Sequence, residues 1–243
     1  MNSEYSSIRP LARVLVLAVG TLLAGCATVR SQPKQPANLR TMEQRVESSR
    51  RIGQQRAEEL KQMSVAELDA DLEADSQRGR EPFNSLAYKE VVGRGENAGP
   101  DLFRVIQAAD RSEHLSLLAL REVDRERYDA LDAGLRSAIL LDALSSSLAF
   151  NVWGIPHLYW EASADSLIAE RAAVPGLVQL LGDKRPAPVW GDEEATIARM
   201  YNYRVCDYAW AMLQAMRGEI HRANVPRDVP SRDRLIEEEL ARH

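Results

Sequence analysis

Residues 174–218 constrain the fold of this 243-residue chain more than any other stretch. The stretch opens with apolar residues on one helical face, and Pro175 stands where a helix can begin, since the N–H that proline lacks has no intrahelical partner in the first turn. Pro186 and Pro188 exclude a helix from the connection that follows, because both lack a backbone donor. Apolar side chains then recur at every third or fourth position until Gly218, which is typical of a helix end. We therefore predict a short helix packed on one long helix.

Helical patterns also fill most of the remaining sequence. Further helices are expected at 42–63, 65–74, 85–92, 100–109, 113–123, 125–148 and 156–172, and a last one is expected to be capped by Ser231. The one strand-like run is interrupted by Gly154 and Pro156, so no strand is predicted. Successive helices with short loops indicate an all-α fold of stacked helical pairs.

Two segments of the central stretch resemble a HEAT-type helical repeat. Residues 173–183 read Ala-Val-Pro-Gly-Leu-Val-Gln-Leu-Leu-Gly-Asp, and the next helix contains Arg204, Asp207 and Ala209, which match in type the residues of the second repeat helix. The resemblance implies a short α-solenoid over residues 83–243, preceded by N-terminal helices at 41–82. Arg204 and Asp207 lie three positions apart on one helical face, so a structural ion pair between neighbouring helices is favoured over a ligand-binding role.

The first residues read as a bacterial targeting signal. Arg9 and Arg13 precede a short apolar run that ends in Leu-Ala-Gly-Cys at Cys26. This tetrapeptide resembles the lipobox of bacterial lipoproteins, which implies that residues 1–25 are a removable signal peptide and that Cys26 carries lipid. An ordinary signal peptide or membrane anchor with an incidental cysteine is the alternative. Several acyl chains would hold the protein at a membrane almost permanently.

The residues after the lipobox bear on the compartment and the partners. Residues 26–40 contain few apolar side chains and two prolines, and they are expected to form a flexible tether. No Asp follows Cys26, so a lipoprotein of a Gram-negative cell is expected at the outer membrane, facing the periplasm.

The net charge of −5 and the lack of a basic run argue against nucleic-acid binding. No cofactor is indicated, and the absence of C-x-x-C and H-x-x-x-H argues against a metal site.

Aromatic residues are the main functional signal. All four tryptophans follow residue 150. The candidate interaction surface comprises Trp153, His157, Trp160 and Trp190, which could hold a peptide or a glycan. The same residues could instead fill the core between two repeats. Trp190, close after two prolines, is the strongest candidate for exposure.

His157 and Cys206 allow a second hypothesis, in which the thiol is an activated nucleophile. Cys206 lies among apolar residues, where a free cysteine usually packs as a small hydrophobe, and no G-x-S-x-G motif is present. We therefore assign no catalytic residue. The favoured function is a non-catalytic interaction or scaffold module of the cell envelope, with a protein or cell-wall partner. The alternatives are an envelope hydrolase that uses the C-terminal aromatic region and a purely structural lipoprotein.

Overall fold

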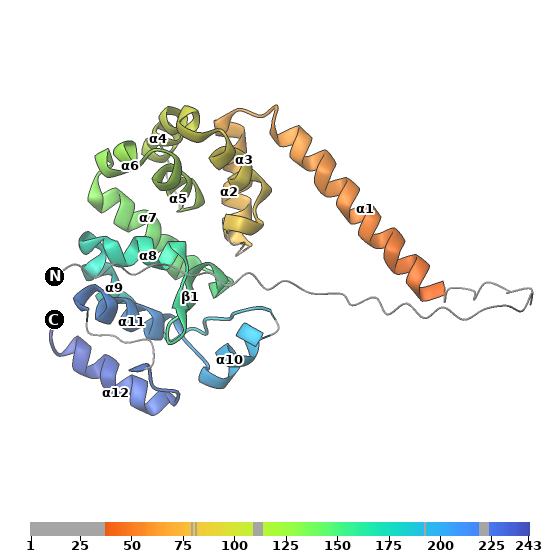
Figure 1. Cartoon of the computed structure of the whole chain (residues 1–243). Helices are drawn as coiled ribbons and strands as arrows, with labels where there is room; N and C mark the ends of the chain where they lie inside the picture. Colours follow the sequence, from red (N-terminus) through yellow and green to blue (C-terminus); the bar gives the residue numbers. More distant parts are fainter. Residues whose placement is uncertain (1–36, 79, 81, 109–113, 192, 219–223) are drawn as a thin grey trace, which may run out of the picture. The chain divides into compact units, whose positions relative to one another are not determined.

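The computed structural model describes residues 37–243 except 79, 81, 109–113, 192 and 219–223 (Figure 1). Most of these residues are helical, which confirms the predicted all-α class. The helices are α1 (Ala37–Leu60), α2 (Val65–Gln77), α3 (Leu86–Gly93), α4 (Gly99–Ala108), α5 (His114–Val123), α6 (Arg125–Ala130), α7 (Ala133–Ser146), α8 (Ala162–Ala169), α9 (Val174–Leu180), α10 (Glu193–Tyr201), α11 (Val205–Arg217) and α12 (Val229–Leu240). Short 3-10 helices lie at Pro82–Asn84, Gly95–Ala98, Phe150–Trp153 and Arg171–Ala173. The predicted signal peptide, Cys26 and residues 27–36 of the predicted tether lie outside the described residues. Residues 37–40, which were also predicted as flexible tether, belong instead to α1.

Helix α5 is at the centre of the first group of helices. All of its residues from His114 to Leu120 are buried. Helices α2, α3, α4, α6, α7 and α8 all contact it. A helix that is buried on every side belongs to the core of a domain. Helix α2 begins at a capping box, in which the Ser64 N–H donates to Glu67 Oε2 at 2.7 Å.

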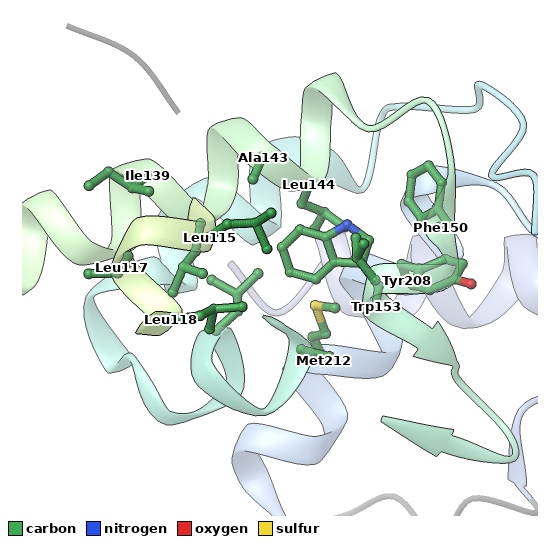
Figure 2. Packing of buried hydrophobic residues seen from close by; sticks show 14 of the residues in the cluster. Leu115, Leu117, Leu118, Ile139, Ala143, Leu144, Phe150, Trp153, Tyr208 and Met212 are labelled. Atoms are coloured by element: carbon green, nitrogen blue, oxygen red, sulfur yellow. The ribbon is translucent and has the colours of Figure 1, made fainter. Parts of the chain in front are cut away.

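Helix α11 has the same role in the C-terminal half. It contacts α8, α9 and α12, and nearly all of its side chains are buried. The close packing of α9 on α11 confirms the predicted packing of the short helix, although its partner is only the second half of the predicted long helix. Figure 2 shows how the two groups meet: Trp153 lies among Leu115 of α5, Leu144 of α7 and Met212 of α11. The core is therefore continuous through the unit formed by Glu47–His243.

The single helix predicted over 125–148 is wrong, because the chain forms α6 and α7 with a break between them. Asp124 caps α6 by accepting from the Arg127 N–H at 3.0 Å. Asp132 caps α7 by accepting from the Leu135 N–H at 3.0 Å. A second capping aspartate inside an apolar helical pattern lets the backbone begin a new helix there.

The long helix predicted up to Gly218 is also two helices, α10 and α11. Asn202 takes a left-handed conformation with φ of 49° and ends α10. The Asp207 carboxylate then accepts from the Arg204 N–H at 2.9 Å at the start of α11. The predicted end is confirmed, since Gly218 has φ of 72° and caps α11.

A small hairpin replaces the start of the helix predicted at 156–172. Strands β1 (Gly154–Ile155) and β2 (Tyr159–Trp160) pair antiparallel, and α8 begins only after them. The prediction that no strand forms was therefore wrong here. Glycine is required at the start of β1 because Gly154 takes φ of 82° and because a Cβ there would lie 2.6 Å from the Tyr159 carbonyl oxygen.

The last helix begins slightly earlier than predicted. Asp228, and not Ser231, caps α12: its side chain accepts from the Ser231 N–H at 2.8 Å. This places Pro230 within the first helical turn, where proline is tolerated.

Candidate ligand-binding site

The connection between α9 and α10 contains an extended segment, residues 186–190, with side chains that alternate in and out. Ala187 and Val189 are buried, with 4% and 7% of their surface exposed. Pro186, Pro188 and Trp190 point the other way, and Trp190 is 64% exposed. This period of two is that of a strand with one face on the core. The outward face is therefore an apolar row in which Pro186 and Trp190 are exposed and Pro188 is half-buried.

Backbone hydrogen bonds on both sides fix this segment. The Ala187 N–H donates to the Tyr203 carbonyl at 2.8 Å, and the Phe150 N–H donates to the Pro188 carbonyl at 2.8 Å. At Trp190 the side chain of Asn151 makes two hydrogen bonds: Nδ2 donates to the Trp190 carbonyl at 2.7 Å, and Oδ1 accepts from its N–H at 2.8 Å. The exposed indole is thus carried by a fixed backbone.

The outward row borders a pocket of about 440 Å³ between this segment and α10. The pocket is lined by Pro186, Ala187, Pro188, Val189, Trp190, Gly191, Ala195, Ala198, Arg199, Asn202 and Tyr203. Buried side chains from both walls form the floor, whereas Trp190, Arg199 and Asn202 are exposed at the rim. A volume of this size is in the range of small-ligand and side-chain pockets.

Tyr203 links the pocket to an aromatic cluster beneath it. His157 Nδ1 and Tyr203 Oη lie 2.6 Å apart, and the His157 ring stacks on Tyr201 with centroids 3.9 Å apart. Burial lowers the pKa of His157 and raises the pKa of Tyr203, so both are neutral at pH 7. In the tautomer protonated at Nε2, the phenol donates to Nδ1. This contact holds the Tyr203 ring at the pocket.

Arg232 of α12 contacts the backbone and the Tyr203 ring at this side of the pocket. Its side chain is 1% exposed, and Nη2 donates to the carbonyls of Tyr201 at 2.7 Å and Asn202 at 3.2 Å. Its guanidinium lies 5.1 Å from the centre of the Tyr203 ring. Arg232 thereby holds the break between α10 and α11, which carries two of the pocket residues.

Arg204 and Asp207 lie together under this break. Arg204 Nη2 lies 2.9 Å from Asp207 Oδ1, and Arg232 Nε lies 3.1 Å from the same oxygen. Arg204 Nη1 also lies 2.8 Å from Asp233 Oδ1. Asp207 is fully buried, and a buried charge needs a partner. Two guanidinium groups balance it, one at the start of its own helix and one from α12.

The four predicted surface residues have different environments. Trp190 lines the pocket, and His157 contacts a residue that does. Trp153 cannot belong to an interaction surface, because it is fully buried and its ring stacks on His114. Trp160 is half-buried on β2 and packs against the core.

Of the described pocket residues, the sequence singled out Trp190 alone, and it missed the polar residues of the other wall, Arg199, Asn202 and Tyr203. Asn202 and Tyr203 lie in the break after α10, which the continuous apolar pattern concealed. The one local signal was Asn202, since asparagine tolerates the left-handed conformation that ends a helix.

The thiol of Cys206 has the properties opposite to those of an activated nucleophile. It is fully buried, and burial raises its pKa to about 11. His157 Nδ1 pairs with Tyr203. An active cysteine needs a lowered pKa and access to solvent, so the hypothesis of a His157–Cys206 pair gains no support.

Within the residues that the structure describes, no group of three or more His, Cys, Asp or Glu side chains is placed to hold a metal ion. In the same part of the chain, no helix combines the length and the apolar character needed to span a bilayer. Comparisons with protein-family models, curated proteins and solved structures found no match to this chain.

Proposed function

We propose that this chain is a lipid-anchored interaction module of the bacterial cell envelope, which captures a partner at the Trp190 pocket. The observation that carries the proposal is the combination of exposure and rigidity at Trp190. Large aromatic side chains that are exposed but held in place bind at low entropic cost, and tryptophan is enriched among the residues that dominate binding energy. Here the indole is 64% exposed, while Asn151 fixes both backbone polar groups of the residue.

The membrane anchor in this proposal rests on the sequence. Leu-Ala-Gly-Cys at the end of the apolar run supports lipidation of Cys26, and residues 26–40 would tether the domain to the membrane. If the cell is Gram-negative, the domain would face the periplasm from the outer membrane. The HEAT-like solenoid is likewise proposed, with the packing of α9 on α11 as its support. Helical repeats commonly serve as binding scaffolds.

The hydrolase alternative draws no support from its candidate nucleophile, because Cys206 is buried with a raised pKa. The interaction module is preferred because the exposed groups at the pocket are of binding character: an indole, a guanidinium and an amide.

The test is capture of the partner in cells that express the full chain with a C-terminal tag. Mild cross-linking, purification through the tag and mass spectrometry are carried out on the wild type and on Trp190→Ala. We expect a defined partner that is recovered with the wild type and reduced about 10-fold or more with Trp190→Ala, as for loss of a dominant interface residue.

Leu240→Ala is the matched control, because Leu240 is also a large exposed hydrophobe, on α12. Both variants must keep the wild-type circular dichroism spectrum and melting temperature. Equal recovery of every protein with Trp190→Ala and with the wild type would contradict the proposed site.

A further inference from the structure

Helix α1 exposes an apolar stripe along its first half. Met42, Val46 and Ile52 are between 61% and 66% exposed, and every side chain from Met42 to Ile52 is exposed. With Ser49 they recur at every third or fourth position, so they share one side of the helix. A helix whose first turns bury no side chain is marginal in water, because helices in proteins are stabilised mostly by packing of their apolar face. A surface that covers the stripe would supply this packing.

The C-terminal end of the same helix is fixed on α2 and α3. Leu60 is buried, and its carbonyl accepts from Arg94 Nη2 at 3.0 Å. Arg56 pairs with Asp71 of α2. The helix is thus held at one end, and its exposed half is the half that is nearer to Cys26 along the chain.

Basic side chains adjoin the stripe. Arg45 lies three positions after Met42, and Arg50 lies four positions after Val46. Between Ala37 and Ile52 the helix carries four arginines and two glutamates, although the whole chain has a net charge of −5. Apolar residues next to arginines are typical of helices that lie on an anionic bilayer, where the apolar side chains enter the headgroup region and the guanidinium groups reach the phosphates.

The position of α1 in the chain favours a bilayer as the covering surface. Residues 27–36 separate the helix from Cys26, the proposed lipid site. A segment of this length spans at most about 36 Å even when it is fully extended. The lipid would therefore keep the start of α1 close to the membrane, at a high effective concentration.

A second copy of the chain is the competing partner. The seam of a coiled coil needs apolar side chains at successive steps of three and four residues. Here the steps after Val46 are Ser49 and Gly53, which bury little apolar surface. A bilayer needs no matching side chains, so a stripe of a few apolar residues is enough for contact with it.

From these observations we infer that the first half of α1 lies on the surface of an anionic bilayer, with Met42, Val46 and Ile52 toward the lipid and Arg45 and Arg50 at lipid phosphates. The inference rests on the proposed function, because the lipid on Cys26 is the tether that brings the helix to the membrane. It adds a second membrane contact to the lipid.

The test places an environment-sensitive fluorophore, NBD, on either side of α1 in the full lipidated chain. The label is attached through Ser49→Cys, within the stripe, or through Gln44→Cys, on the opposite side. Labelling is specific because Cys26 carries the lipid and Cys206 is buried. The chain is reconstituted at several protein densities into vesicles of equal parts phosphatidylglycerol and phosphatidylcholine, and into vesicles of phosphatidylcholine alone. Emission wavelength and quenching by aqueous iodide report contact of the label with lipid.

In the anionic vesicles we expect the label at position 49 to emit at shorter wavelength and to be shielded from iodide, whereas the label at position 44 should stay exposed to water. Val46→Asp in the Ser49→Cys chain should shift the equilibrium about 10-fold or more toward the free helix. Gln54→Asp, which adds the same charge on the polar side of the helix, is the matched control and should leave the helix bound.

Equal iodide quenching at positions 44 and 49 would overturn the inference. Shielding of position 49 that depends on protein density and not on phosphatidylglycerol would also overturn it, since that result assigns the stripe to a second copy. Mass spectrometry of the purified chain tests the anchor separately. Absence of lipid on Cys26 would refute the proposed anchor and this inference with it, whereas lipid on Cys26 with equal quenching would refute the helix contact alone.

Discussion

Replacing Arg232 with methionine should destabilise the protein more than any exposed substitution. Methionine keeps much of the length and apolar stem of the side chain but removes the guanidinium. In the wild type this group is buried and pairs with Asp207 at 3.1 Å. It also donates to four backbone carbonyls, those of Tyr201, Asn202, Pro226 and Arg227.

The expected loss of stability follows from the groups that lose their partner in Arg232→Met. Four backbone carbonyls lose a donor that is worth about 1 kcal/mol each. Asp207 keeps only Arg204 as a cationic partner. Removal of one member of a buried ion pair typically costs about 3–5 kcal/mol. Since neighbouring losses are not additive, we expect about 4 kcal/mol, which corresponds to a fall in melting temperature of roughly 10 °C for a chain of this size.

The assay is urea denaturation followed by circular dichroism and tryptophan fluorescence. Arg234→Met is the matched control, since Arg234 is on the same helix with a side chain that is 72% exposed. Arg232→Met should lower the urea concentration at the unfolding midpoint without changing the dependence of the unfolding free energy on urea. The stability of the control should stay within about 0.5 kcal/mol of the wild type. A loss below about 1 kcal/mol for Arg232→Met would refute the role given to this residue.

Three further predictions concern the core. Burial lowers the pKa of His114 to about 4, below its unfolded value of about 6.5. The protein should therefore lose up to about 3 kcal/mol of stability as pH falls from about 6.5 to about 4. Urea titrations at a series of pH values should show that His114→Phe removes this part of the pH dependence. The thiol of Cys206 should resist a disulfide reagent at pH 8 in the folded Cys26→Ser variant and react after guanidinium is added; rapid labelling of the native protein would show that it is accessible. Gly154→Ala should cost at least about 2 kcal/mol in thermal melts, because the new Cβ would meet the Tyr159 carbonyl at 2.6 Å; Gly218→Ala, which has positive φ but open space, should cost about 1 kcal/mol, and equal effects would contradict the steric argument.

Features that depend on local signals could be predicted from the sequence. Pro175 and Gly218 mark the start of α9 and the end of α11 through their own backbone preferences. Ser64 and Glu67 likewise mark the start of α2. In each case the residues that decide the structure lie within one helical turn of it.

Features that depend on distant residues could not be predicted. The break between α10 and α11 is held by Arg232, which lies about thirty residues further along the chain. The apolar pattern of residues 193–217 gives no sign of that contact. Of the pocket, only the exposure of Trp190 was predicted, because this residue follows two prolines. The opposite wall depends in part on the break between α10 and α11, which was not predicted. Trp153 was misassigned because aromatic composition alone does not distinguish a surface from the core.

The measurement that tests the central claim most directly is position-resolved photo-crosslinking in cells. A photo-crosslinking amino acid replaces Thr196, which is exposed on α10 one turn from Arg199, or Arg234 on α12. We predict a defined partner adduct from position 196 that disappears when Trp190→Ala is added, and no such adduct from position 234. The same adducts from both positions, or an adduct at 196 that persists without Trp190, would contradict the assignment of this pocket as the interaction site.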